Sequence, residues 1–178
     1  WKTTPEPRLY KDTEKSLANF DGGVWYRKTV DIPKAWAGKD LVLDLGSIDD
    51  SDITWFNGVR IGSTTEAHNQ HRGYEVKGAI VKPGPATIAV LAIDSGGAGG
   101  MTGPEKKMRL RPEQFAKDAP ESISLASEWR WKKGGAHSGP RPSTSVPNLA
   151  EPGTSPQDYS ALHNGMLAAF TPYAVRGA

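Results

Sequence analysis

Apolar and polar residues alternate along several stretches of the first 132 residues, at the period of two that is typical of strands with one buried face. Residues 23–33 alternate in this way, and a proline ends the run. In residues 41–48 three leucines at every second position share one face. Residues 107–113 alternate again. The pattern predicts half-buried strands in all three stretches.

Residues 52–62 give the clearest local signal, because two β-rich runs flank the pair Asn57-Gly58. This pair tolerates a positive φ at both central positions of a tight turn, so it predicts a β-hairpin. Residues 85–94 form the most apolar run and predict a central strand, and residues 121–133 predict a last strand or pair of strands. About seven strands with short connections, and no long helix between them, favour an all-β fold: an antiparallel jelly-roll sandwich.

The organisation of the chain changes after the last of these strands. We expect a lead-in segment at 1–22, the sandwich at 23–132 and a Pro/Gly/Ser-rich linker at 133–157. Residues 158–178 predict one short helix followed by the start of a strand, with Leu162, Met166 and Phe170 on one helix face. An apolar stripe of this kind is expected to fold back on the sandwich or to drive association with another chain.

Composition and charge narrow the function classes. The chain has no cysteine, which excludes disulfides, thiolate nucleophiles and cysteine-zinc sites. Its 22 basic and 20 acidic residues give a net charge of +2, and no long basic run indicates contact with nucleic acid or a membrane surface. No stretch of about 18 apolar residues predicts a membrane span. Because the chain begins with Trp1, we expect a processed or excised segment, so that any signal peptide would lie outside this sequence.

Two motifs suggest catalysis or metal binding, and each has a simpler interpretation. Asp94-Ser95-Gly96 follows an apolar strand, as a hydrolase serine does, but the glycines after it favour a sharply turning loop over the helix such a serine normally opens. His68 and His71 stand three residues apart, as in a metal clamp, yet no third ligand is evident and a solvated loop is favoured.

Acidic and aromatic residues provide further candidates. Asp49, Asp50 and Asp52 could form a calcium site or a glycosidase carboxylate pair, although turn chemistry explains them more simply. Five of the tryptophans lie near predicted strands, where such rings more often pack in a core than stack on a sugar. They are Trp25, Trp36, Trp55, Trp129 and Trp131.

Several blocks in succession resemble a known family. FDGGVWYRKTVDIPKAWAGKDLVLDLGSIDDSDITWFNGVRIGS, HRGYEVKGAIVKPGPATIAVLAID, SGGAGGMTGP and SLASEWRWKK are similar to the β-sandwich inserted in sialate O-acetylesterase family proteins. That module is itself similar to the sugar-binding-like jelly-roll domain of glycoside hydrolase family 2, a galactose-binding-domain-like fold. The ending LHNGMLAAFTPYAVRGA resembles the segment that re-enters the SGNH-hydrolase domain of these esterases, with His163 where the family usually has tyrosine.

The resemblance implies an accessory domain and a fragment of a secreted or periplasmic carbohydrate O-acetylesterase, which would be its main partner. The family's serine, its Asp-His pair and its Gln-Gly-Glu motif match nothing in this chain. No catalytic residue, metal or cofactor is therefore assigned, and we expect the chain alone to be inactive. Two alternatives remain open, an independent glycan-binding module and a purely structural spacer between domains.

Loops at one end of a jelly roll commonly carry ligands, so the binding hypothesis assigns most of its candidates there. The candidates for contact with carbohydrate are Asp49, Asp50, His71, Arg72 and the glycine loop with Gly99 and Gly100, together with Trp55 and Asn57, which the hairpin already explains.

Overall fold

The computed structural model describes residues 1–4, 10–101, 103, 107–114 and 121–136. The chain divides into two units, Trp1–His137 and Ser138–Ala178, and the described residues belong to the first. The predicted helix at 158–178, its apolar stripe and most of the predicted linker lie outside the described residues. Within the described ranges no helix is long and apolar enough to cross a membrane.

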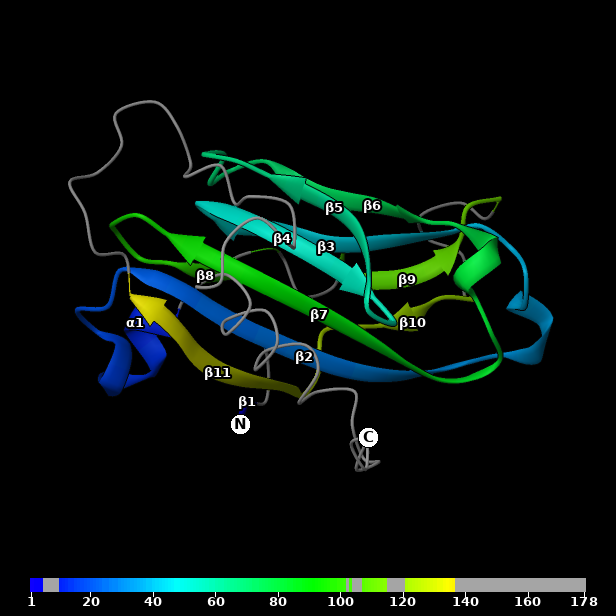
Figure 1. Ribbon diagram of the computed structural model, residues 1–178, viewed down its shortest axis with the longest axis horizontal. Helices are drawn as coiled ribbons and strands as arrows, with labels where there is room; N and C mark the ends of the chain where they lie inside the picture. The colour runs from blue at the N-terminus through cyan, green and yellow to red at the C-terminus, as the bar shows by residue number, and fades with distance from the viewer. Residues whose placement is uncertain (5–9, 102, 104–106, 115–120, 137–178) are drawn as a thin grey trace, which may run out of the picture. The chain divides into compact units, whose positions relative to one another are not determined.

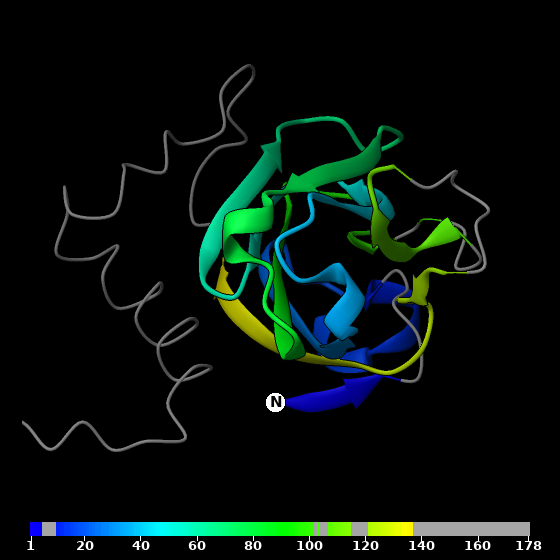
Figure 2. The same ribbon diagram turned by 90° about the vertical axis from the view of Figure 1, so that its right-hand side faces the viewer.

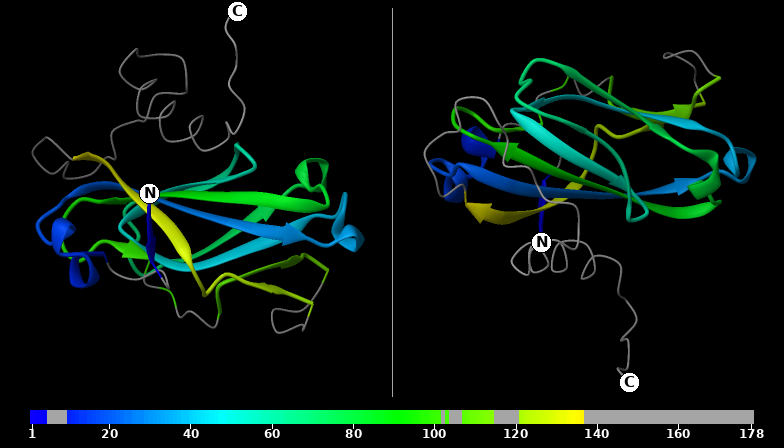
Figure 3. Two further views of the ribbon diagram at one scale, coloured as in Figure 1. Left: turned by 90° about the horizontal axis from the view of Figure 1, so that it is seen from below. Right: turned by 45° about the horizontal axis from the view of Figure 1, so that its top comes forward.

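The first unit is an antiparallel β-sandwich of two facing sheets (Figures 1 and 2), as the sequence predicts. The larger sheet has six strands in the order β1-β11-β2-β7-β4-β5. The two longest strands, β2 and β7, pair over eleven residues, from Gly22 opposite Asp94 to Ile32 opposite Gly84, and run side by side along the sandwich (Figure 3). The strands are β1 (Lys2–Thr4), β11 (Trp129–Ala136), β2 (Gly22–Ile32), β7 (Gly84–Asp94), β4 (Ser51–Phe56) and β5 (Val59–Thr64).

The second sheet has five strands, ordered β10-β9-β3-β6, with β8 paired to the end of β3. The described helices have three or four residues each and stand at connections between strands. The strands are β10 (Ile123–Ser124), β9 (Arg109–Pro112), β3 (Leu41–Asp49), β6 (His71–Val76) and β8 (Gly100–Met101). The helices are α1 (Tyr10–Thr13), η1 (Lys15–Leu17), η2 (Lys34–Trp36) and η3 (Gly78–Ile80).

The predicted hairpin is confirmed. β4 pairs with β5 across Asn57 and Gly58, whose φ angles are +48° and +82°. Both angles lie in the left-handed region that this turn requires and that Asn and Gly tolerate best. The turn therefore fixes which residues of β4 face the core.

Alternate side chains of the two sheets meet to form the core. β3 contributes four fully buried apolar residues, and alternating apolar residues of β2 and β7 face them. Burying each large apolar side chain contributes about 1.5–3 kcal/mol to folding. Trp36, Trp129 and Trp131 belong to this core, whereas Trp25 and Trp55 are buried but lie outside it.

A β-bulge in β3 places Gly46 directly against Gly103. The register of β3 with β6 shifts between Asp44 and Gly46, and Gly46 has a φ of +74°. A Cβ atom at Gly46 would lie 2.5 Å from the Cα atom of Gly103. Only glycine meets both the backbone and the steric requirement at this position.

We predict that Gly46→Ala lowers the free energy of unfolding by more than about 2 kcal/mol, because it combines an unfavourable φ with a backbone clash. Gly135→Ala is the matched control, since an added Cβ there meets no atom within 4 Å. Urea unfolding followed by tryptophan fluorescence measures both variants. Equal midpoints for the two would contradict this account of the bulge.

Candidate functional site

Polar side chains gather at one end of the sandwich, where β3 ends and β4 begins. The loops 65–70 and 95–99 adjoin this end, and we call the whole region the polar end. It brings together six of the eight residues predicted to contact carbohydrate, while Trp55 and Asn57 lie elsewhere. The six are Asp49, Asp50, His71, Arg72, Gly99 and Gly100.

A buried ion pair organises the polar end. Arg72 of β6 and Asp52 of β4 both point inward with no exposed side-chain surface, and the Arg72 Nε atom lies 2.9 Å from an Asp52 carboxylate oxygen. The remaining N–H groups of the guanidinium donate to four backbone carbonyls, those of Ile48, Asp50, Ala67 and Gln70. An arginine has five N–H donors, and all five of Arg72 are used. In this structure Arg72 therefore has no donor left for a ligand.

Asp52 is equally occupied. Thr54 donates its hydroxyl to the Asp52 carboxylate at 2.8 Å, and the Tyr74 hydroxyl lies 2.9 Å from both carboxylate oxygens. Burial raises the pKa of Asp52, and the bonds from Arg72, Thr54 and Tyr74 oppose that rise. The carboxylate proposed as a possible calcium ligand thus serves as the acceptor of an internal network.

Asp49 and Asp50 hold the glycine-rich loop. Asp50 accepts hydrogen bonds from the backbone N–H and the hydroxyl of Ser95, at 3.0 and 2.8 Å. Asp49 accepts one from the N–H of Gly99 at 3.1 Å, and pairs in register with Gly100 of β8. Residues 95–98 are bends without a helix, so the predicted loop is confirmed for this stretch.

The charge environment of Asp49 is unfavourable for a carboxylate. Burial raises its pKa, and the neighbouring Asp50 and Asp94 raise it further, although the Gly99 N–H opposes them. Several carboxylates therefore lie close together, and hydrogen bonds from backbone N–H groups offset part of the repulsion between their negative charges.

Two residues of the lead-in segment, Tyr10 and Lys11, contact the polar end at Asp94. Asp94 is fully buried, and the Lys11 ammonium of α1 lies 2.7 Å from it and 2.5 Å from Asp21. Tyr10 donates its hydroxyl to Asp94 at 3.1 Å, and burial with Asp94 nearby raises the Tyr10 pKa. Sequence reasoning missed this cluster, because Tyr10 and Lys11 stand in a short, polar stretch with no periodic signal.

His71 points outward from the second sheet and is partly exposed. Its Nε2 atom lies 3.0 Å from the carboxylate of Asp44, a residue buried in β3. His68 instead contacts the side chain of its neighbour Asn69 at 2.8 Å. Among the described residues, the grouping close enough to suggest a metal ion contains neither histidine.

Trp55 and Asn57 occupy different surfaces. Trp55 packs against Trp25 on the outer face of the six-stranded sheet, with ring centroids 5.3 Å apart and 33° between the ring planes. Asn57 accepts a hydrogen bond from the Thr87 N–H at 2.8 Å, in the hairpin turn. Contact of either residue with a sugar remains a prediction, as it does for the six residues at the polar end.

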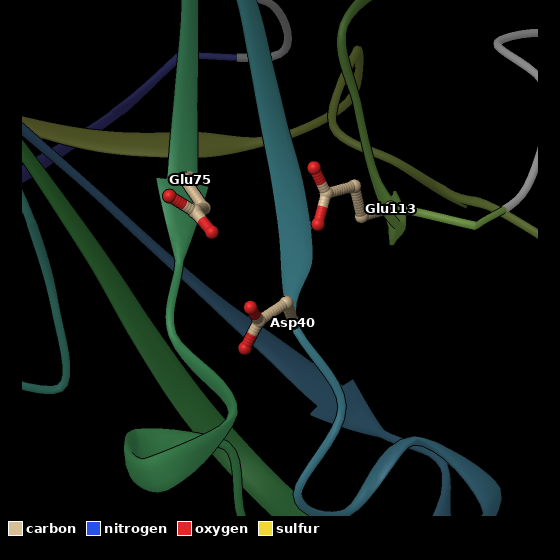
Figure 4. Close-up of side chains that lie close together, drawn as sticks. All are labelled: Asp40, Glu75 and Glu113. Atoms are coloured by element: carbon tan, nitrogen blue, oxygen red, sulfur yellow. The ribbon is translucent and has the colours of Figure 1, made fainter.

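A further acidic cluster comprises Asp40, Glu75 and Glu113, with carboxylate oxygens within 4.8 Å of one another (Figure 4). Lys77 forms ion pairs with Asp40 and Glu75, and the Gly78 N–H donates to Asp40 at 2.6 Å. The hydrogen bond from Gly78 lowers the pKa of Asp40 below its usual value, and the positive charge of Lys77 lowers it further. Sequence reasoning missed the cluster because three strands far apart along the chain bring it together.

Comparison with known proteins gives partial matches. No family model matches the sequence. A β-glucuronidase of Paenibacillus borealis is 36% identical over 61 residues, which are 33% of this chain and 10% of that protein. The β-glucuronidase of Canis lupus familiaris is 31% identical over 95 residues, 50% of this chain and 14% of that protein. The chain thus spans a small fraction of the length of these relatives.

Solved structures give matches of the same kind. The β-glucuronidase of Ruminococcus gnavus matches 72% of this chain and 22% of its own, with 18% identity and a TM-score of 0.44. A glycoside hydrolase family 2 β-galacturonidase of Eisenbergiella tayi matches 53% of this chain and 15% of its own, with 16% identity and a TM-score of 0.42. The predicted resemblance to a family 2 sandwich fits the curated relatives, whereas the O-acetylesterase resemblance finds no support among them.

We predict that Asp49→Asn raises the melting temperature at pH 7 by about 1–3 °C. Asparagine keeps an oxygen for the Gly99 N–H and removes the repulsion from Asp50 and Asp94. A carboxyl whose pKa is raised in the folded state destabilises the fold as pH rises above its unfolded value near 4, so the gain should vanish by about pH 3.

Differential scanning calorimetry at pH 3 and pH 7 measures this difference. The exposed Asp31 provides the matched control, Asp31→Asn, which should change the melting temperature little at either pH. A lower melting temperature for Asp49→Asn at pH 7 would show instead that the fold requires the charge of Asp49.

Proposed function

We propose that this chain is a non-catalytic β-sandwich domain of a larger carbohydrate-active hydrolase of the glycoside hydrolase family 2 type. The proposal rests on the 31% identity with the β-glucuronidase of Canis lupus familiaris over 95 residues, which are only 14% of the length of that enzyme. An antiparallel sandwich is consistent with an accessory role in such an enzyme.

The chemistry of the polar end supports a non-catalytic role. A serine nucleophile needs a base within hydrogen-bond reach and a donor for the developing oxyanion. The Ser95 hydroxyl instead donates to Asp50, which also accepts the Ser95 N–H. The carboxylates of Asp49 and Asp50 both bind loop amides, so they act here as structural acceptors.

The domain would help to shape access of a sugar chain to the active site of the larger protein. Asp49, Asp50 and the loop with Gly99 are the polar-end groups through which it would do so, with His71 beside them on the outer face. This role extends the binding hypothesis drawn from the sequence, and it assigns no direct contact to Arg72, whose N–H donors are all used within the protein.

A second candidate parent is a carbohydrate O-acetylesterase. The resemblance of residues 162–178 to the segment that re-enters the SGNH domain favours it. The gene sequence on both sides of this segment distinguishes the two parents. A Trp-Tyr-Gln-Gly-Glu motif directly after residue 178 would identify the esterase, and a family 2 catalytic domain would identify the glycoside hydrolase.

We predict that the purified chain hydrolyses neither p-nitrophenyl β-D-glucuronide nor p-nitrophenyl acetate above the buffer rate. Continuous absorbance assays of the chain, of Ser95→Ala and of the control Ser63→Ala measure this directly. Turnover that disappears in Ser95→Ala and persists in Ser63→Ala would contradict the non-catalytic assignment.

A further inference from the structure

Three arginines lie in one row across the six-stranded sheet. Arg130 of β11 pairs with Arg27 of β2, and the same row continues through β7 and β4 to Arg60 of β5. Figure 1 shows four of these strands, β11, β2, β7 and β4, side by side in this order. We call Arg130, Arg27 and Arg60 the arginine row; Ala89 and Trp55 stand between Arg27 and Arg60.

The row lies on the outer face of the sheet. Successive side chains of a strand point to opposite faces, and Val24 and Tyr26 of β2 point into the core. Arg27 therefore points away from the core, as does Arg130, which lies between the core residues Trp129 and Trp131. Arg130 and Arg60 are exposed, and Arg27 is half-buried.

The charges in the row are not neutralised by the described part of the chain. Arg27 and Arg130 stand directly opposite each other, an arrangement of like charges that destabilises a sheet. Burial lowers the pKa of Arg27, and the charge of Arg130 lowers it further. No ion pair joins either residue to an acid among the described residues, whereas Arg72 has an ion pair and a full set of hydrogen bonds.

Spacing within the row indicates the form of a binding partner. Neighbouring strands lie about 4.8 Å apart, so Arg27 and Arg130 can hold one anionic group between them, and Arg60 stands about 14 Å from Arg27 along the row. A single small anion cannot reach both points. An extended chain with repeated anionic groups can, and guanidinium groups match carboxylates with paired hydrogen bonds.

Tryptophans lie within the same surface. Trp55 stands in the row between Ala89 and Arg60, and Trp25 lies two residues before Arg27 on β2. The ring centroids of the two tryptophans are 5.3 Å apart. Each has 6% of its surface exposed. Because Trp55 stands in the row and Trp25 packs against it, we expect their indole fluorescence to respond to charge bound at the row without stacking on a sugar.

We propose that the arginine row binds the carboxylates of an acidic sugar chain, a polyuronate, on the outer face of the six-stranded sheet. This inference rests on the proposed function, because only a domain of a carbohydrate-active protein gives reason to prefer an acidic sugar over an acidic protein surface. The site is separate from the polar end and takes part in no bond breaking.

The test uses the full chain and three probes matched in length. They are the hexamer of galacturonate, the same hexamer with every carboxylate methyl-esterified, and a hexaglutamate peptide. Isothermal titration calorimetry and tryptophan fluorescence at low ionic strength should show binding of the acid hexamer that weakens with added salt. The esterified hexamer should bind at least about tenfold more weakly, because it lacks the charge-assisted hydrogen bonds.

Arg27→Gln/Arg130→Gln is the decisive variant, and Lys39→Gln/Lys82→Gln is the control with the same change of net charge at exposed positions away from the row. The first should weaken binding about tenfold or more, and the second should change it less than about twofold. The melting temperature of Arg27→Gln/Arg130→Gln should stay the same or rise by up to about 3 °C, because the substitutions remove the repulsion between two like charges.

Three results would overturn the inference. They are no binding of the acid hexamer, equal loss of binding in both double variants, and binding of hexaglutamate as tight as that of the hexamer, which would indicate an acidic protein partner. These outcomes are independent of the hydrolysis assays and of the gene sequence, so failure of this inference is distinguishable from failure of the proposed function.

Discussion

The buried guanidinium of Arg72 is the interaction on which the polar end depends. Its N–H groups bind the carbonyls of Ile48 and Asp50 at the end of β3, and the carboxylate of Asp52 in β4. They also bind the carbonyl of Ala67 in the loop 65–70, so that one side chain of β6 joins three parts of the fold. Removing one partner of such a pair costs about 3–5 kcal/mol, because the other charge stays buried. Asp50 is thereby held where its carboxylate can bind the loop at Ser95. The polar end is consequently an arrangement of internal contacts, although its sequence suggests a ligand site.

The sequence predicted those parts of the fold that local chemistry determines. Alternation identified β2 and β3, and Asn57-Gly58 identified the β4–β5 hairpin, because neighbouring residues suffice for both. The partners of Arg72, Lys11 and Asp94 depend on strand pairing, which no local pattern specifies. Loops at one end of a jelly roll commonly carry ligands, and on that ground the sequence made Arg72 a candidate for contact with carbohydrate, whereas the structure buries its side chain completely. Its place between the end of β3 and the loop 65–70 becomes evident only once β6 is paired with β3.

Two groups of charges on the same sandwich thus have opposite roles. At the polar end Asp49, Asp50 and Asp52 each accept hydrogen bonds from the protein, and Arg72 has acceptors for all its N–H groups. On the outer face Arg27 and Arg130 face each other without an ion pair among the described residues. Internal satisfaction is typical of structural groups, and uncompensated like charge is typical of a surface that meets an anion. This contrast distinguishes the internally bonded charges of Arg72 and Asp52 from the like charges of the arginine row.

The exchange of guanidinium protons with solvent shows whether every N–H group of Arg72 stays bonded within the protein. Nitrogen-detected NMR of the chain with labelled arginines resolves each Nε–H signal, and the exposed Arg60 gives the internal reference. We expect the Nε–H of Arg72 to exchange far more slowly than that of Arg60, because exchange at Arg72 requires the fold to open. Exchange of Arg72 as fast as that of Arg60 would show that its network opens freely to solvent, and would contradict the account.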